Sequence, residues 1–290
     1  MFLANNWEDY ELIDAGFGEK LERWGNVTVR RPEPQAVWPS NFAKKSSEWN
    51  DVDAIYHRSK TGGGHWEFQN NRAEKKVKIA YGDIKFYVEL MSFKHTGVFP
   101  EQAINWEWMS DLIEKEDRKV KVLNLFAYTG GVSIACAKEG AEVCHVDASK
   151  GMIARAKENM NLSGLSDKPV RYIADDVMKF VQREMRRGNK YDAIVMDPPT
   201  YGRGPKGELW KIEDTLCELV ETCTQILSDD PLFFLINSYT TGLTPVMLDN
   251  ILNIYLARKI GGSVSAKEIG IPISSSNLIL TCGASGRWEK

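Results

Sequence analysis

From residue 121 onward, short apolar runs alternate with longer stretches in which apolar residues recur every three or four positions. The runs predict buried strands, and the longer stretches predict amphipathic helices. The predicted strands are 121–126, 142–147, 170–174, 192–196, 232–238, 264–269 and 277–282. The predicted helices between them are 131–139, 149–163, 176–187, 211–228 and 244–258. Such alternation is typical of βα units and of a parallel sheet.

The last two predicted strands, 264–269 and 277–282, have no helix between them. A short connection can join antiparallel strands but not parallel ones. The pattern therefore predicts an α/β fold of the doubly wound kind, in which a seven-stranded sheet ends with an antiparallel strand.

The first 95 residues follow another pattern, with five tryptophans and short alternating runs at 27–31, 77–80 and 84–90. The sequence Tyr81-Gly82-Asp83 between two of these runs predicts a hairpin. Tryptophans in a small β-rich module more often form its core than a stacking surface for bases. We therefore predict a β-rich module over 1–95 and an α/β domain over 96–290, with the helix-like stretch 100–117 linking them.

Composition and charge limit the choice of partners. Of the 290 residues, 43% are hydrophobic and 27% are charged, and the net charge is −3. No basic domain stands out, which argues against a strongly basic nucleic-acid-binding protein but allows a local patch. The first residues lack the basic and apolar pattern of a leader, and no apolar run approaches the ~18 residues of a membrane span. We expect a cytoplasmic protein with no membrane contact.

Cysteine and histidine spacing predicts neither disulfides nor a metal site. The five cysteines show no C-x-x-C pair and lie in apolar or helical patterns, so free thiols in a reducing compartment are expected. The four histidines are scattered without ligand spacing, so no metal is expected. The cysteines are Cys136, Cys144, Cys217, Cys223 and Cys282.

The tetrapeptide Asp197-Pro198-Pro199-Thr200 directly follows the apolar run of a predicted strand. Ligands of open α/β sheets bind beyond the carboxyl ends of the strands. Proline fixes φ and lacks an N–H donor, so the tetrapeptide predicts a stiff rim whose carbonyls are free to accept hydrogen bonds. The alternative is a simple stop between strand and loop.

A second candidate lies after the first strand of the α/β domain, where Gly130 and Gly131 precede a helix. Glycine permits a tight turn, and a helix N-terminus offers free N–H donors. The segment lacks the G-x-G-x-x-G spacing of a dinucleotide fingerprint. Its candidate binding residues are Asn124, Phe126, Ala127, Tyr128, Thr129 and Gly130.

Acidic residues follow the next two strands. The Asp147 carboxylate could accept both hydroxyls of a ribose. The segment Asp175-Asp176-Val177 could take the exocyclic amine of adenine. Both acidic groups could equally cap the helices that follow them. Since the features after four successive strands share one sheet edge, we favour a single binding site.

These motifs resemble those of the class I S-adenosylmethionine-dependent methyltransferases, and within them the bacterial large-subunit rRNA methyltransferases that act on cytosine or guanine. The resemblance covers about two thirds of the chain and includes 94–102, 124–131, 146–149, 174–177 and 197–202. It implies a Rossmann-like class I methyltransferase sheet, S-adenosyl-L-methionine as cofactor and RNA as a partner. The implied cofactor contacts are the loop 126–130 under the methionine part, Asp147 at the ribose, Asp176 and Val177 at the adenine, and Thr96, Phe99 and Gln102 at the sulfonium end. Ala148, Ser149 and Asp175 are further candidate cofactor-binding residues beside them.

The candidate catalytic groups lie at the tetrapeptide, since a bound methyl donor needs only an aligned acceptor. Asp197 or the adjacent carbonyls of Pro198 and Pro199 would hold the methyl acceptor, and Tyr201 would either stack on a flipped base or anchor the loop. The basic stretch 202–207 would form a substrate-facing lid or a plain solvated loop.

Three departures from the family bear on the substrate. Family members that methylate carbon 5 of cytosine carry a cysteine after the fifth strand, whereas this chain has Asn237-Ser238-Tyr239 there. Ala103 replaces a usual arginine, and the separate RNA-binding domain of the relatives has no evident counterpart. We therefore predict direct methyl transfer to nitrogen or oxygen, without a covalent cysteine intermediate. Alternatives are a methyltransferase for a small molecule or protein, a silent RNA-binding relative, and a nicotinamide-dependent oxidoreductase, which the missing glycine spacing argues against.

Overall fold

The computed structural model describes residues 1–41, 47–59, 63–69, 75–90, 94–203 and 209–290. They form two compact units. The sheet unit contains Met1–Phe2, Ile104–Ile269 and Gly283–Lys290, and the N-terminal unit contains Leu3–Ala103 and Gly270–Cys282. The sequence places the division between residues 95 and 96, whereas the structure divides the chain after Ala103 and adds a distant C-terminal segment to the N-terminal unit.

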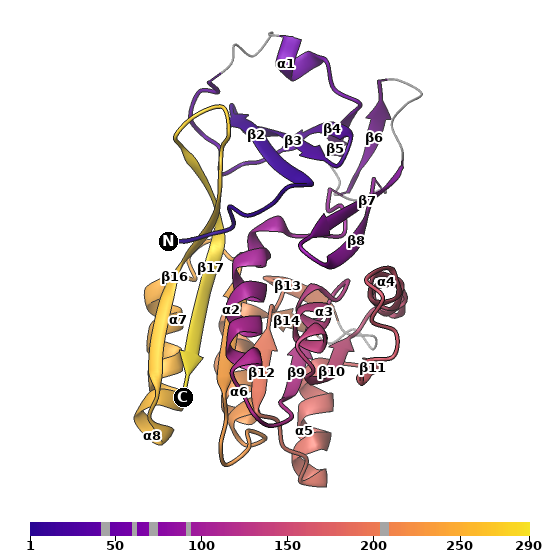
Figure 1. Cartoon of the computed structure of the whole chain (residues 1–290). Helices are drawn as coiled ribbons and strands as arrows, with labels where there is room; N and C mark the ends of the chain where they lie inside the picture. The colour runs from indigo at the N-terminus through magenta and orange to yellow at the C-terminus, as the bar shows by residue number, and fades with distance from the viewer. Residues whose placement is uncertain (42–46, 60–62, 70–74, 91–93, 204–208) are drawn as a thin grey trace. The chain divides into compact units, whose positions relative to one another are not determined.

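An eight-stranded sheet with the order β1-β16-β17-β15-β12-β9-β10-β11 organises the sheet unit (Figure 1). Its strands are β1 (Phe2–Leu3), β9 (Lys121–Leu125), β10 (Glu142–Asp147), β11 (Val170–Ala174), β12 (Ala193–Met196), β15 (Phe233–Ser238), β16 (Ser263–Pro272) and β17 (Ile279–Glu289). Strands β11, β10, β9, β12 and β15 pair in parallel, and β17 pairs antiparallel to β15. The predicted α/β sheet with a terminal antiparallel strand is confirmed. The sequence pattern missed β1, because two residues are too few to show a period.

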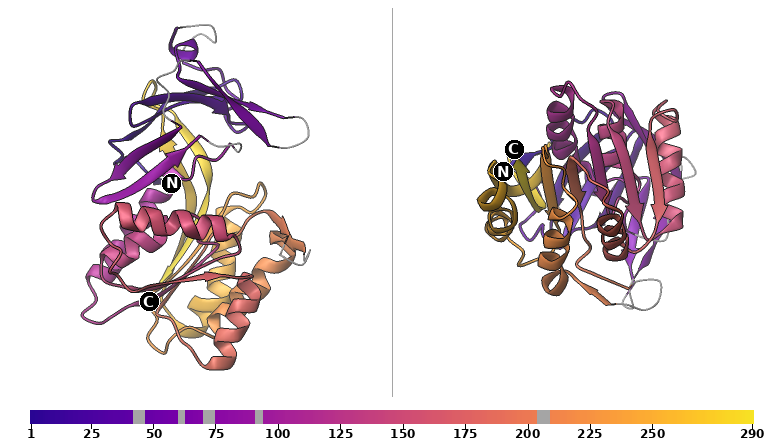
Figure 2. Two further views of the ribbon diagram at one scale, coloured as in Figure 1. Left: turned by 90° about the vertical axis from the view of Figure 1, so that its right-hand side faces the viewer. Right: turned by 90° about the horizontal axis from the view of Figure 1, so that it is seen from below.

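Helices cover both faces of this sheet (Figure 2). They are α2 (Ala103–Glu114), α3 (Gly131–Lys138), α4 (Lys150–Leu162), α5 (Val177–Arg187), α6 (Ile212–Thr224), α7 (Pro245–Leu252) and α8 (Arg258–Ile260), with a π-helical turn at Asn253–Ala257. Leu123 and Leu125 pack into one apolar cluster with Phe180, Leu216 and Leu248 of α5, α6 and α7. Because side chains alternate along a strand, Asn124 faces the opposite layer, to which α3 belongs.

The N-terminal unit is rich in β-structure, as the sequence predicts. It contains a five-stranded sheet of β2 (Tyr10–Gly16), β3 (Glu19–Trp24), β4 (Val27–Pro32), β5 (Ala54–Arg58) and β6 (Gly64–Phe68), the hairpin β7 (Lys76–Tyr81) and β8 (Ile84–Glu89), and the short helix α1 (Ser47–Asn50). The hairpin turns at Gly82, whose φ is 53°. Trp24, Trp49 and Trp66 are buried, which confirms the predicted core role for these three, whereas Trp7 and Trp38 are half-buried.

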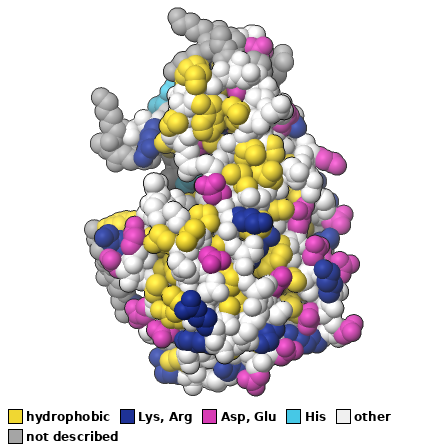
Figure 3. Space-filling model, turned by 90° about the vertical axis from the view of Figure 1, so that its left-hand side faces the viewer, with side chains coloured by type: hydrophobic (Ala, Val, Ile, Leu, Met, Phe, Trp, Pro, Cys, Tyr) yellow, Lys and Arg dark blue, Asp and Glu magenta, His cyan; other side chains and the backbone are white. Residues whose placement is uncertain are grey.

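The state of the cysteines and the distribution of surface charge agree with the expectations from the sequence. All five cysteines are free thiols. On the face drawn in Figure 3, basic and acidic side chains are interspersed, and neither sign covers a continuous area. None of the helices in the described ranges has the length and apolar character needed to cross a membrane.

Candidate functional site

The candidate residues of the sheet unit meet at the carboxyl ends of four parallel strands. The register pairs Leu125 of β9 with both Val146 of β10 and Met196 of β12, and Asp147 with Ala174 of β11. The four strands therefore end at one level. The segments that follow them, 126–130, 147–149, 175–177 and 197–201, are brought to the same edge.

The loop between β9 and α3 has an unusual backbone. Phe126 and Tyr128 have φ values of 56° and 50°, in the left-handed region that non-glycine residues seldom adopt. Gly130, with φ 91°, precedes the first residue of α3. The amide of Ala127 donates to the carbonyl of Val146 at 3.0 Å, which ties the loop to β10. Strained backbone of this kind is typical of ligand-binding loops.

The Asp147 carboxylate joins two of these segments. Its Oδ2 accepts from the amide of Tyr128 at 2.9 Å, and its Oδ1 accepts from the amide of Ser149 at 2.8 Å. Burial raises the pKa of Asp147, and the two amides oppose that rise. A carboxylate has about four acceptor positions, so positions remain for the two hydroxyls of a ribose.

An acidic residue caps the following helix in only one of the two acidic segments. After β10 the cap of α4 is Ser149, whose Oγ accepts from the amide of Met152 at 3.3 Å, and Ala148 is exposed. After β11 the cap of α5 is Asp176, whose Oδ1 accepts from the amide of Lys179 at 2.9 Å.

The three residues after β11 differ in their availability to a ligand. Asp175 is engaged, since it pairs with Arg183 and accepts from the amide of Asp176. The Oδ2 of Asp176 makes no hydrogen bond within the described ranges. Val177 is buried beside it at the start of α5. Asp176 and Val177 therefore fit the edge of an adenine ring better than Asp175 does.

The rim at Asp197–Thr200 differs from its prediction in one respect, because two of its carbonyls are already used. The Pro199 carbonyl accepts from Trp210 Nε1 at 2.6 Å, and the Thr200 carbonyl accepts from the amide of Ile212 at 3.1 Å. The expectation of free carbonyls is wrong for these two. Pro198 is buried and Asp197 is half-buried, so the rim is held rigidly.

Two short strands, β13 (Tyr201–Arg203) and β14 (Leu209–Lys211), follow the rim as an antiparallel pair. The lid expected at 202–207 begins inside β13, and its residues 204–207 lie outside the described ranges. Tyr201 is 54% exposed, so its ring is accessible for contact.

Sequence reasoning missed Trp210, Ser133 and His145, which support these loops. The ring of Trp210 lies 5.2 Å from that of Phe126 and so connects the rim to the loop after β9. Beneath that loop, Asn124 Nδ2 donates to Ser133 Oγ at 3.0 Å, and Ser133 Oγ lies 2.9 Å from His145 Nδ1. The only sequence signal for this network was a polar residue inside each apolar run.

Other predicted site residues lie in the N-terminal unit. Thr96 and Gln102 are buried, and the Phe99 ring lies 5.2 Å from that of His95. Their contact with the sulfonium end stays a prediction. Among the described residues, no group of three or more His, Cys, Asp or Glu side chains could hold a metal ion.

The strand order and the loops at its carboxyl edge define a nucleotide-cofactor-binding domain of the doubly wound class. A family model described as S-adenosylmethionine-dependent methyltransferase matches residues 50–230. The chain belongs to this family, whose cofactor is S-adenosylmethionine.

Solved structures agree with this membership. A SAM-dependent methyltransferase from Agrobacterium tumefaciens is 38% identical, with a TM-score of 0.94 over 99% of this chain and 92% of that one. The protein SMU.776, solved with SAH, is 19% identical, with a TM-score of 0.69 over 98% of this chain and 76% of its own, and shows the fold alone.

Two curated relatives are named as ribosomal RNA methyltransferases. Ribosomal RNA large subunit methyltransferase I of Aeromonas salmonicida is 35% identical over 43% of this chain and 31% of its own length. Ribosomal RNA large subunit methyltransferase K/L of Shewanella frigidimarina is 32% identical over 71% of this chain and 27% of its own length. The chain thus spans between a quarter and a third of the length of these relatives.

Proposed function

We propose that this chain transfers the methyl group of S-adenosylmethionine to a nitrogen or oxygen atom of an RNA base, with ribosomal RNA as the substrate class and the cytoplasm as the location. The observation that carries the proposal is the Asp147 carboxylate, which is fixed by two backbone amides and keeps acceptor positions for a ribose. It stands between a left-handed loop and the start of α4, at the sheet edge where such folds bind ligands.

The proposed cofactor site uses three of the four segments at this edge. The loop after β9 supports the methionine part, Asp147 accepts the ribose hydroxyls, and Asp176 with Val177 meets the adenine. The bound cofactor supplies a methyl group that is already activated, so the protein chiefly aligns the acceptor with it. Asn124 supports the loop after β9 from beneath, through its hydrogen bond to Ser133.

The fourth segment forms the proposed substrate side. Asp197 accepts a hydrogen bond from the amino or ring N–H of the acceptor, while the buried Pro198 and the exposed Pro199 hold the rim in one conformation. Tyr201 offers an exposed ring on which a flipped base can stack. Trp210 keeps the rim at a fixed distance from the loop after β9, through its hydrogen bond to Pro199 and its contact with Phe126.

The residues at the end of β15 favour direct transfer. Asn237 and Ser238 occupy the place of the family's nucleophilic cysteine, and both are buried. Asn237 Oδ1 accepts from Asn105 Nδ2 at 3.1 Å and from Ser285 Oγ, so its side chain is held within the unit. Burial raises the pKa of the Cys136 and Cys223 thiols, which disfavours their thiolates as nucleophiles.

The substrate class is supported by the relatives, two of which are named as ribosomal RNA methyltransferases. The test measures whether the chain transfers tritium from labelled S-adenosylmethionine to RNA, protein or metabolite fractions, which are prepared from cells that lack this chain. We expect label in RNA, at a nitrogen or oxygen of one nucleoside. Label confined to protein or metabolites would instead identify the alternative substrates, and cofactor binding without label in any fraction would identify a silent relative.

A further inference from the structure

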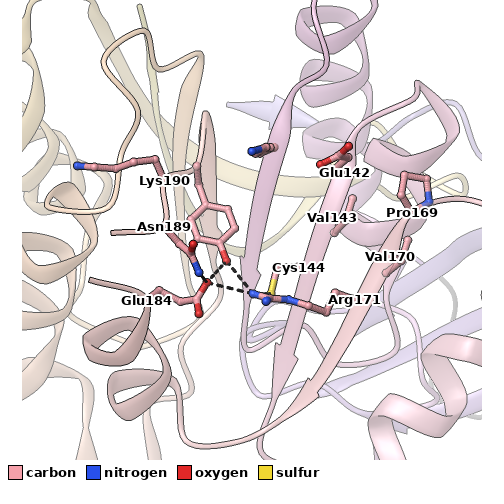
Figure 4. A pocket seen from close by; sticks show the side chains of 11 residues that line it. Glu142, Val143, Cys144, Pro169, Val170, Arg171, Glu184, Asn189 and Lys190 are labelled. Carbon is pink, nitrogen blue, oxygen red and sulfur yellow. Dashed lines mark hydrogen bonds and ion pairs between the residues drawn. The ribbon is translucent and has the colours of Figure 1, made fainter. Parts of the chain in front are cut away.

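A pocket of the sheet unit lies at the edge opposite the candidate site, where β9, β10 and β11 begin (Figure 4). Its volume is about 610 Å³. The charged and amide side chains that line it are Lys121, Glu142, Arg171, Glu184, Asn189 and Lys190. The proposed methyl transfer uses none of them, because its residues follow the carboxyl ends of the same strands.

All the hydrogen bonds that fix the Arg171 side chain are made by one of its own nitrogens, Nη2. Its Nη2 lies 3.1 Å from Glu184 Oε2, 3.1 Å from the Tyr191 hydroxyl and 3.2 Å from Cys144 Sγ, as the dashed lines of Figure 4 partly show. Glu184 is fully buried and also accepts from the Tyr191 hydroxyl at 2.7 Å and from Asn189 Nδ2 at 2.9 Å. Arg187 Nη1 also pairs with Glu184, at 3.2 Å, so the buried carboxylate holds two cations, and moving the Arg171 guanidinium would remove one of them from Oε2 at a cost. The cation is therefore held in place before any ligand arrives.

Several side-chain N–H groups at this pocket have no partner among the described residues. The Nε and Nη1 of Arg171 make no hydrogen bond with the described residues, and its side chain is 50% exposed. The exposed Lys121 ammonium likewise has no partner in the described ranges. Lys190 Nζ donates to the carbonyl of Gln225 at 2.8 Å and keeps its other hydrogens.

The charges around the pocket leave a positive excess. Arg171 offsets Glu184, and Glu142 is paired at 3.3 Å with Lys119. Lys121 and Lys190 remain without a carboxylate partner in the described part of the chain. A guanidinium held in place and the Lys121 ammonium line the same pocket, and both carry the charge that a phosphate group requires.

We propose that this pocket binds a phosphate group, carried either by a small molecule or by an RNA backbone. Arg171 donates from Nε and Nη1, and Lys121 and Lys190 supply charge from the walls. The proposal is independent of the methyl-transfer site, since the two sites share no residue.

The primary test is titration of the full chain with inorganic phosphate at constant ionic strength, followed by calorimetry. We expect saturable binding that Lys121→Gln weakens about tenfold, the usual effect of losing one charge-assisted hydrogen bond. Lys121 is exposed and unbonded, so this variant should fold normally. The matched control is Arg186→Gln, which removes the same charge from an exposed side chain outside the pocket and should leave the affinity unchanged. Glu142→Gln should tighten the binding of phosphate, because it removes a negative charge from the lining of the pocket.

Two further titrations identify the source of the phosphate. Single-stranded RNA that binds, is weakened by Lys121→Gln and is displaced by inorganic phosphate would point to an RNA backbone. Phosphate binding with no such RNA competition would point to a small molecule. Absence of saturable binding by either probe would overturn the proposal, as would an equal loss of affinity in the Lys121→Gln and Arg186→Gln variants.

Discussion

At the scale of single residues, Trp210 is the side chain that connects the rim with the loop after β9. Its indole N–H donates to Pro199, and its ring contacts Phe126. Replacement by phenylalanine removes the hydrogen bond and keeps an aromatic contact, so we expect a loss of about 1 kcal/mol in the free energy of unfolding. Replacement by alanine should cost more, because the ring contact is lost as well. Urea denaturation measures both, and equal effects of the two variants would contradict this role.

His145 gives the stability of the chain a predictable pH dependence. Burial lowers its pKa from 6.5 to about 4. Burial, followed by the charge of Arg31, lowers the pKa of His95 to about 4 as well. Folding therefore favours both neutral imidazoles, and the stabilisation present above pH 6.5 is lost as the pH falls toward 4.

We expect the free energy of unfolding to decrease from about pH 7 to about pH 5 in the natural chain. Each single variant, His95→Asn or His145→Asn, should lessen this slope, and the double variant should remove most of it. His65→Asn, at an exposed site, is the control. Urea denaturation across this pH range provides the measurement, and a slope that survives in the double variant would refute the explanation.

At the scale of elements, the start of α3 is fitted against α2. A Cβ added to Gly131 would lie 2.6 Å from Trp106 Cζ2, so Gly131→Ala should reduce the free energy of unfolding by about 1–3 kcal/mol. In α4, a Cβ on Gly151 would meet only Ser149 Oγ, at 3.7 Å. Gly151→Ala should therefore raise stability by up to about 1 kcal/mol. Thermal unfolding of the two variants compares them directly, and similar effects of the same sign would contradict the packing argument.

Hydrophobic periodicity predicted the elements that are long enough to show a period. The strands of the parallel sheet and the helices α3 to α6 were anticipated, because each buries a regular apolar face. The three-residue strands β13 and β14 were missed, since hydrogen bonds within the hairpin define them rather than apolar burial. Hydrogen bonds that no hydrophobic period reveals decided what the sequence left open, including the capping role of Asp176 and the engaged carbonyl of Pro199.

At the scale of the whole molecule, two distant parts of the chain build the N-terminal unit. Within it, the amides of Ser274 and Ser275 donate to the carbonyls of Leu12 at 2.9 Å and Ile13 at 3.0 Å. No local sequence pattern could have revealed this pairing, because it joins segments more than 250 residues apart.

We therefore expect a fragment of residues 3–103 to lack a cooperative unfolding transition. The same fragment joined through a flexible linker to residues 270–282 should regain one, because the paired segment and its buried side chains are restored. Urea denaturation followed by tryptophan fluorescence makes the comparison. Equal cooperativity of the two fragments would show that the C-terminal segment is dispensable.

The central claim is that the carboxyl edge of the sheet, with Asp147 at its middle, binds the methyl-donor cofactor. Calorimetric titration with S-adenosylhomocysteine tests it most directly. We predict saturable binding by the natural chain, a loss of about tenfold or more in Asp147→Ala, and no change in the control Asp167→Ala, which alters an exposed carboxylate away from this edge. Absence of binding by the natural chain, or equal affinity of Asp147→Ala and the natural chain, would contradict the claim.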